Sequence, residues 1–256
     1  MKLYRETKGA GPELVLLHGW GLNSAVWQSL YAALIPHYRV TSVELPGHGA
    51  SPAAESADPQ AWAAACLAAA PRSAHWVGWS LGGQLAIQAA LQAPDRVAGL
   101  SLIATTPCFV RGEGWDLAMP LATFAAFAKS LDDAPDSALL RFLLLQVQGD
   151  EQGRSTLRQL RAEMGRRPSA SLSGLNHGLA LLRATDLRAQ LAEIRCRQQW
   201  LFGARDTLVP IGLADWIDDR LPAARLERIA GAGHAPFLSR PQHCLRYLRE
   251  AIDSGG

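Results

Sequence analysis

The sequence lacks the marks of several large protein classes. Its four cysteines show no C-x-x-C spacing, which argues against a zinc site and fits thiols in a reducing compartment. No stretch reaches the roughly 18 apolar residues of a membrane span. The charged segment at residues 1–13 lacks the apolar core of a secretory signal. We therefore expect a cytoplasmic protein that holds no metal and no cofactor and does not associate with a membrane.

An excess of charge of one sign is also missing. The 25 Lys and Arg residues nearly balance the 23 Asp and Glu residues, for a formal net charge of +2, which is too small to indicate a nucleic-acid partner. Hydrophobic residues make up 48% of the 256 residues. This is enough for one large domain with its own core, with or without an insertion.

Short apolar runs of strand character recur along the chain, with helical patterns between most of them. The runs lie at residues 14–17, 40–45, 74–78, 100–104, 199–203 and 226–229. This alternation predicts an α/β fold, with a mostly parallel sheet covered by helices on both faces.

The alternation breaks between residues 110 and 185, where apolar residues at helical spacing continue without a convincing strand. We interpret 110–185 as a helical cap inserted into a core made of residues 1–109 and 186–256. In open α/β sheets the ligand crevice lies beyond the carboxyl ends of the strands, so an insertion at this point would cover it.

A serine lies at the junction between one predicted strand and the helix that follows. In Gly78-Trp79-Ser80-Leu81-Gly82 the flanking glycines allow a close approach of strand and helix, and the abrupt turn strains the central residue. Backbone strain of this kind is typical of functional sites. The alternative is that Ser80 is simply a small residue at a tight helix start.

A serine hydroxyl attacks only when a base takes its proton, so a histidine and a carboxylate are expected elsewhere in the chain. Asp206 lies in the loop after the predicted strand 199–203, and His234 lies in a glycine-rich loop after the last predicted strand. The order Ser, Asp, His at three strand ends predicts a catalytic triad.

Two rival residues have other expected roles. Glu44 ends the second predicted strand and precedes Ser80 in the chain, so we expect it to organise the turn at 46–49. His243 follows Asp206 but lies within a helical pattern, so we expect it on the surface.

These landmarks resemble the α/β-hydrolase family, and the resemblance covers nearly the whole chain. It rests on G-x-S-x-G at 78–82, the later Asp and His, and H-G-x-G at 18–21. The resemblance implies that the backbone N–H groups of Trp20 and Leu81 bind the oxyanion and that His18 braces its loop.

Within that family the chain resembles the carboxylesterases of biotin synthesis that act on the methyl ester of pimeloyl-acyl-carrier protein. The stretches that carry this resemblance are 18–23, 78–83, 107–109, 141–146, 186–188 and 234–237. It implies hydrolysis to a free carboxylate and methanol, with an acyl carrier protein as partner. We also expect the protein to be a monomer. The residues that the resemblance implies for substrate binding are Trp20, Ser80, Leu81, Phe142, Leu143, Leu144, Leu145, Gln146 and His234.

Other readings remain open at this point. The run at 142–145 offers apolar surface for a methylene chain, but helix packing alone would also explain it. The scaffold also suits a hydrolase of small esters or of carbon–carbon bonds, or a ligand receptor that performs no catalysis.

Residues 152–185 contain six arginines and one acid, Glu163. Arg154, Arg158 and Arg161 follow helical spacing and would share one helix face, with Arg141 in the neighbouring segment. We expect these four arginines to contact the acidic carrier protein, with a solvated helix face as the alternative interpretation.

Overall fold

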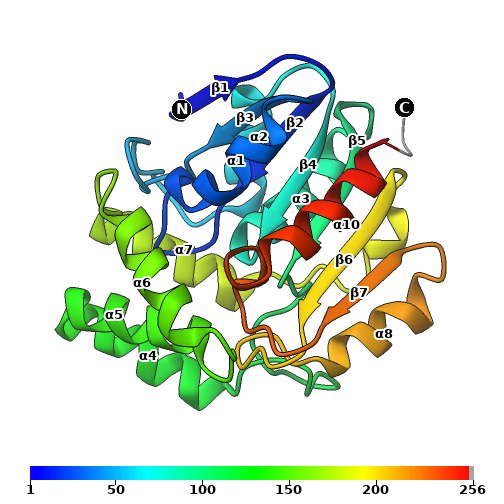
Figure 1. Ribbon diagram of the computed structural model, residues 1–256. Coiled ribbons are helices and arrows are strands. Elements are labelled where there is room, and N and C mark those ends of the chain that lie inside the picture. The colour runs from blue at the N-terminus through cyan, green and yellow to red at the C-terminus, as the bar shows by residue number, and fades with distance from the viewer. Residues whose placement is uncertain (254–256) are drawn as a thin grey trace.

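A seven-stranded sheet forms the centre of the protein (Figure 1), and the computed structural model describes residues 1–253. The strand order is β1-β3-β2-β4-β5-β6-β7, and every neighbouring pair is parallel except the antiparallel pair β1 and β3. The strands are β1 Arg5–Lys8, β2 Glu13–Leu17, β3 Arg39–Val43, β4 Ala74–Trp79, β5 Val97–Ile103, β6 Arg197–Gly203 and β7 Arg225–Ile229. The predicted fold class is therefore confirmed, and β2 to β7 correspond to the six predicted strands.

The edge strand β1 is the element that the sequence did not predict. Its four residues, Arg-Glu-Thr-Lys, are all polar, and three of them are exposed. Because no apolar alternation marks it, β1 is held by its pairing with β3 and not by burial of its side chains.

Helices cover both faces of the sheet because successive strand residues face opposite sides. On one face α1 and α10 pack against residues such as Leu16 and Val77, and on the other α2, α3 and α8 pack against residues such as Leu17 and Trp76. The bounds of these helices are α1 Gln28–Leu34, α2 Pro59–Ala69, α3 Leu81–Gln92, α8 Gly212–Arg220 and α10 Pro241–Asp253, with short α9 at Pro236–Ser239.

Four further helices lie between β5 and β6 and add no strand to the sheet: α4 Leu121–Asp133, α5 Pro135–Val147, α6 Gly153–Met164 and α7 Leu172–Ala184. They lie together at the end of the sheet where the parallel strands finish (Figure 1). The chain leaves and re-enters the core at one point, since Cys108 pairs with Asp186 and Leu187 N–H donates to Pro107 O at 2.9 Å.

Within residues 1–253, no helix combines the length and the apolar character that crossing a bilayer requires.

Helix α3 lies unusually close to the sheet because glycines line the contact. A Cβ atom placed on Gly78 of β4 would lie 2.5 Å from the Cα of Gly83 in α3, and one placed on Gly83 would collide with the side chain of Thr105. Such distances are shorter than van der Waals contact, so the start of α3 keeps its place only while both positions lack a side chain.

We predict that Gly78→Ala destabilises the protein by about 3 kcal/mol, because backbone atoms cannot yield to the added methyl group. The measurement is urea unfolding followed by circular dichroism. Gly112→Ala is the matched control, since a Cβ there meets nothing within 4 Å. Equal midpoints for the two variants would contradict the packing argument.

Candidate active site

Ser80 sits at a sharp turn between β4 and α3. Its backbone has φ 54° and ψ −119°, a left-handed conformation that costs a residue with a Cβ about 1–3 kcal/mol. The turn is held by hydrogen bonds on both sides, because Ser80 N–H donates to Ile103 O at 3.0 Å and Ser80 O accepts from Gly83 N–H at 2.9 Å. The predicted strain at this position is therefore present.

Asp206 and His234 meet at the ends of β6 and β7. His234 Nδ1 lies 2.7 Å from Asp206 Oδ2, and both side chains are buried. The other carboxylate oxygen, Oδ1, accepts from the backbone N–H groups of Leu208 and Val209 at 2.8 and 3.0 Å. The carboxylate is thus fixed by three hydrogen bonds, and the Nδ1–H tautomer leaves Nε2 with a free lone pair.

The serine turn and the histidine loop are tied together by Trp79. Its indole Nε1–H donates to His234 O at 2.8 Å, and its ring lies 5.8 Å from the imidazole ring. His234 Nε2 is buried and makes no hydrogen bond with any described residue, Ser80 included. Such contacts commonly form only when the substrate is bound.

The loop that carries Trp20 crosses the start of α3. A Cβ atom placed on Gly19 would lie 3.4 Å from Ser80 Cβ, and one on Gly82 would collide with His18 O. Among residues 1–253, no hydrogen bond partner occurs for the backbone N–H of Trp20 or of Leu81. Both N–H groups are therefore available as hydrogen-bond donors beside Ser80.

Two buried histidines brace this loop. His18 Nε2 accepts from Leu45 N–H at 3.1 Å and its Nδ1–H donates to Gly19 O at 2.8 Å, as expected for a bracing role. His48 Nε2 accepts from Gly21 N–H at 3.1 Å. Burial lowers the pKa of His18 to about 4 and that of His48 to about 3, so both rings are neutral near pH 7.

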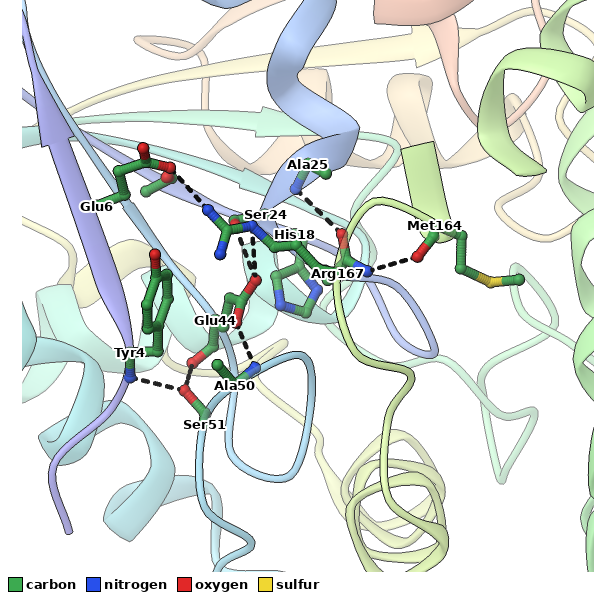
Figure 2. Close-up of polar contacts among 12 residues, drawn as sticks. Tyr4, Glu6, His18, Ser24, Ala25, Glu44, Ala50, Ser51, Met164 and Arg167 are labelled. Carbon is green, nitrogen blue, oxygen red and sulfur yellow. Dashed lines mark hydrogen bonds and ion pairs between the residues drawn. The ribbon is translucent and has the colours of Figure 1, made fainter. Parts of the chain in front are cut away.

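Glu44 and His243 take part in other contacts. Glu44 is fully buried and accepts hydrogen bonds from Ser24 Oγ and Ala50 N–H (Figure 2), and it makes none with His234. His243 lies on α10 with its Nε2 at 2.6 Å from Glu227 Oε1, and it is half-buried instead of fully exposed. Neither residue competes with Asp206 or His234.

Helix α5 divides its residues 142–146 between different surroundings. Phe142 and Leu143 are buried in different apolar clusters, whereas Leu144 is 47% exposed. The Phe142 ring lies 4.8 Å from the Trp20 ring in an edge-on contact. The helix therefore cannot turn all five residues toward one interior.

The end of α5 holds the loop of His234. Gln146 O accepts from His234 N–H at 3.0 Å, and Asp150 Oδ2 accepts from Gly233 N–H at 2.8 Å. The Gln146 side chain is buried, and its amide makes no hydrogen bond with the described residues. Sequence patterns did not single out Asp150, because its role depends on a contact 83 residues away in the chain.

The predicted basic face exists on α6. Arg154, Arg158 and Arg161 are exposed along this helix, and Arg141 is exposed on α5. Arg154 and Arg158 line an open hollow of about 670 Å³, and Leu144 of α5 lines it as well.

Residues 1–253 contain no cluster of His, Cys, Asp or Glu that could hold a metal ion, and the four cysteines are free. Cys108 is partly buried, which raises the pKa of its thiol. A neutral thiol is a weak nucleophile, so Cys108 does not compete with Ser80.

The strained Ser80 turn, the buried Asp206 and His234 pair and the mostly parallel sheet are those of an α/β hydrolase. The sequence matches the alpha/beta hydrolase family over residues 14–243, and the chain belongs to this family.

Relatives over the full length share a more specific name. The chain is 43% identical to a pimeloyl-[acyl-carrier protein] methyl ester esterase of Chromobacterium violaceum, with 99% of each chain covered. It is 41% identical to the protein of that name from Methylococcus capsulatus, over 99% of this chain and 100% of the other. For the protein of that name from Serratia marcescens the identity is 43%, with 98% of each chain covered.

Solved structures support the fold. An esterase from Exiguobacterium antarcticum superposes with a TM-score of 0.87 at 23% identity, over 98% of this chain and 95% of the other. A bromoperoxidase from Bacillus anthracis superposes with a TM-score of 0.85 at 20% identity and the same coverage.

Proposed function

We propose that this chain is a serine carboxylesterase that hydrolyses the methyl ester of pimeloyl-[acyl-carrier protein] in biotin synthesis. The observation that carries the proposal is the buried His234 and Asp206 pair, 2.7 Å apart, in a chain 43% identical over its whole length to an esterase of that name. We assign the helices α4 to α7 as the cap over the site, and we infer a cytoplasmic location, which suits four free cysteines.

In this mechanism Ser80 Oγ attacks the ester carbonyl while His234 Nε2 takes the hydroxyl proton. Asp206 stabilises the imidazolium that forms. The N–H groups of Trp20 and Leu81 bind the oxyanion of the tetrahedral intermediate. The imidazolium then protonates the departing methoxide, and methanol leaves behind an acyl-enzyme. His234 next takes a proton from water as the water oxygen attacks the acyl-enzyme carbonyl. The imidazolium then returns this proton to Ser80 Oγ as the C–O bond to Ser80 breaks, which releases the carboxylic acid product and restores the enzyme.

The acyl chain would lie between the core and the cap. Trp20 and Leu81 both pack against Gly178 of α7, since a Cβ there would lie 2.6 Å from a Trp20 ring carbon and 3.5 Å from Leu81. Phe142 completes this apolar contact. Leu145 packs against the same apolar cluster as Trp20 and Phe142, so we place Leu145 and Gln146 along this path, with exposed Leu144 at its outer end. Leu143 belongs to the other apolar cluster, which argues against its expected role in substrate binding.

We place the carrier protein on the exposed arginines of α5 and α6. Arg141, Arg154, Arg158 and Arg161 would attract an acidic surface and raise the association rate.

Replacement of Ser80 tests the enzyme assignment. We expect Ser80→Ala to lose at least about 10³-fold in turnover of the carrier-bound methyl ester, because the nucleophile is removed. Mass spectrometry of the carrier protein measures the reaction, and labelling by a fluorophosphonate should occur in the wild type only. Substantial activity in Ser80→Ala would contradict the proposed nucleophile. A wild type that cleaves only short esters would indicate a small-ester hydrolase, and one that neither reacts nor is labelled would indicate a binding protein.

Asp206→Asn tests the acid of the triad. The amide keeps the shape but presents a hydrogen-bond donor to His234 Nδ1, which favours the wrong tautomer, so turnover should fall by about 10⁴. Steady-state hydrolysis of a p-nitrophenyl ester measures the loss. A greater loss in Glu44→Gln than in Asp206→Asn would show that the wrong carboxylate has been assigned.

Charge reversal tests the docking surface. Arg154→Glu with Arg158→Glu should raise KM for the carrier-bound ester by about 10-fold, because a screened attraction becomes a repulsion. Hydrolysis of a short p-nitrophenyl ester should stay within about 2-fold, since the reacting groups are untouched. The control is Arg195→Glu with Arg220→Glu, two exposed arginines outside α4 to α7 that give the same change in net charge. Equal effects of both double variants on KM would place the carrier elsewhere.

A further inference from the structure

Three segments that are far apart in the sequence converge on the buried carboxylate of Glu44 (Figure 2). Ser24 Oγ, from the loop after β2, donates to Glu44 Oε1 at 2.8 Å. Ala50 N–H, from the loop after β3, donates to Oε2 at 2.6 Å. Arg167, from the connection between α6 and α7, places its Nε 3.3 Å from Oε1.

Arg167 brings positive charge to a carboxylate that has no exposed surface. The arginine side chain is itself only 20% exposed, and its Nη2 also lies 2.7 Å from Glu6 Oε2. Its guanidinium carbon is 4.7 Å from the centre of the Tyr4 ring. Removal of one partner from a buried ion pair leaves an uncompensated charge, so the position of Glu44 depends on Arg167.

Glu44 in turn anchors the loop that carries the Trp20 N–H. The loop is bound to Glu44 through Ser24, four residues after Trp20. A second link joins it to the cap, because Asn23 Nδ2 donates to Met164 O at 3.1 Å. The connection between α6 and α7 is also bound to the loop after β3, since Ser171 N–H donates to Gly47 O at 2.8 Å.

We propose that Arg167 is a positioning residue for ester hydrolysis, which by pairing with Glu44 fixes the loop at 18–24 so that the Trp20 N–H faces the developing oxyanion. This inference rests on the proposed function, because it concerns the oxyanion donors of that reaction. Arg167 touches neither the ester nor the reacting atoms.

Arg167→Gln tests the proposal with a short p-nitrophenyl ester, and active sites are titrated with a fluorophosphonate. We expect kcat per titrated site to fall about 10-fold while KM changes less than about 2-fold, because an oxyanion donor acts in the transition state and not in substrate binding. Arg167→Lys, which keeps the positive charge, should recover most of the lost kcat.

The matched control is Arg166→Gln. Arg166 is the neighbouring residue, but it is exposed and pairs with Glu163 of α6, so its kcat per site should stay within about 2-fold of the wild type. Should Arg167→Gln have the same kcat per site as Arg166→Gln, or should it raise KM alone, the positioning role is wrong. An Arg167→Lys variant as slow as Arg167→Gln would also overturn the proposal.

A second variant keeps the test decisive if Arg167→Gln does not fold. Glu44→Gln with Arg167→Gln removes charge and counter-charge together, which restores folding without restoring the ionic contact. Its kcat per titrated site should remain about 10-fold low, and a wild-type value would overturn the inference. An inactive wild type would overturn the proposed function and this inference with it, whereas an active wild type and an unaffected variant would overturn the inference alone.

Discussion

The direct packing of helix α3 on the sheet is the constraint on which the site depends. Because Gly78 and Gly83 leave no room for a Cβ, the chain must reverse between β4 and α3 within one residue, and that residue is Ser80 at φ 54°. Its strain is sustained by backbone hydrogen bonds to β5 and to the first turn of α3. In the proposed reaction, the free N–H groups at the start of the helix would bind the oxyanion beside Ser80.

Both buried carboxylates are stabilised by several polar partners. Asp206 receives two backbone N–H groups and the imidazole of His234. Glu44 receives a hydroxyl, a backbone N–H and a guanidinium. His234 reaches Asp206 from another loop, and Ser24 and Arg167 reach Glu44 from two other segments, so each carboxylate also joins separate loops. The two carboxylates differ in that only Asp206 is paired with an imidazole, a group that can act as a base near neutral pH.

The sequence predicted the elements that a local pattern of residues marks. Six strands carry apolar runs, and Ser80, Asp206 and His234 follow strand ends in the expected order, so the sheet and the meeting of Asp206 with His234 could be anticipated. The polar edge strand β1 has no such pattern. Trp79, Asp150 and Arg167 act through contacts made between distant segments, which depend on how helices pack and leave no periodic trace in the sequence. The assignment of substrate came from resemblance and not from physical chemistry alone.

The helices between β5 and β6 do more than cover the strand ends, because they supply hydrogen-bond partners to two loops of the site. Gln146 and Asp150 hold the loop of His234 from the end of α5. Met164 and Arg167 hold the loop of Trp20 and its support from the end of α6. The loops of His234, the proposed general base, and of Trp20, a proposed oxyanion donor, are therefore held near the two ends of α6. The same helix carries Arg154, Arg158 and Arg161. A force applied to α6 by a docked partner would be transmitted to both loops through these hydrogen bonds and one ion pair. The surface that would receive the carrier protein is thus linked by direct contacts to the two loops that carry His234 and Trp20.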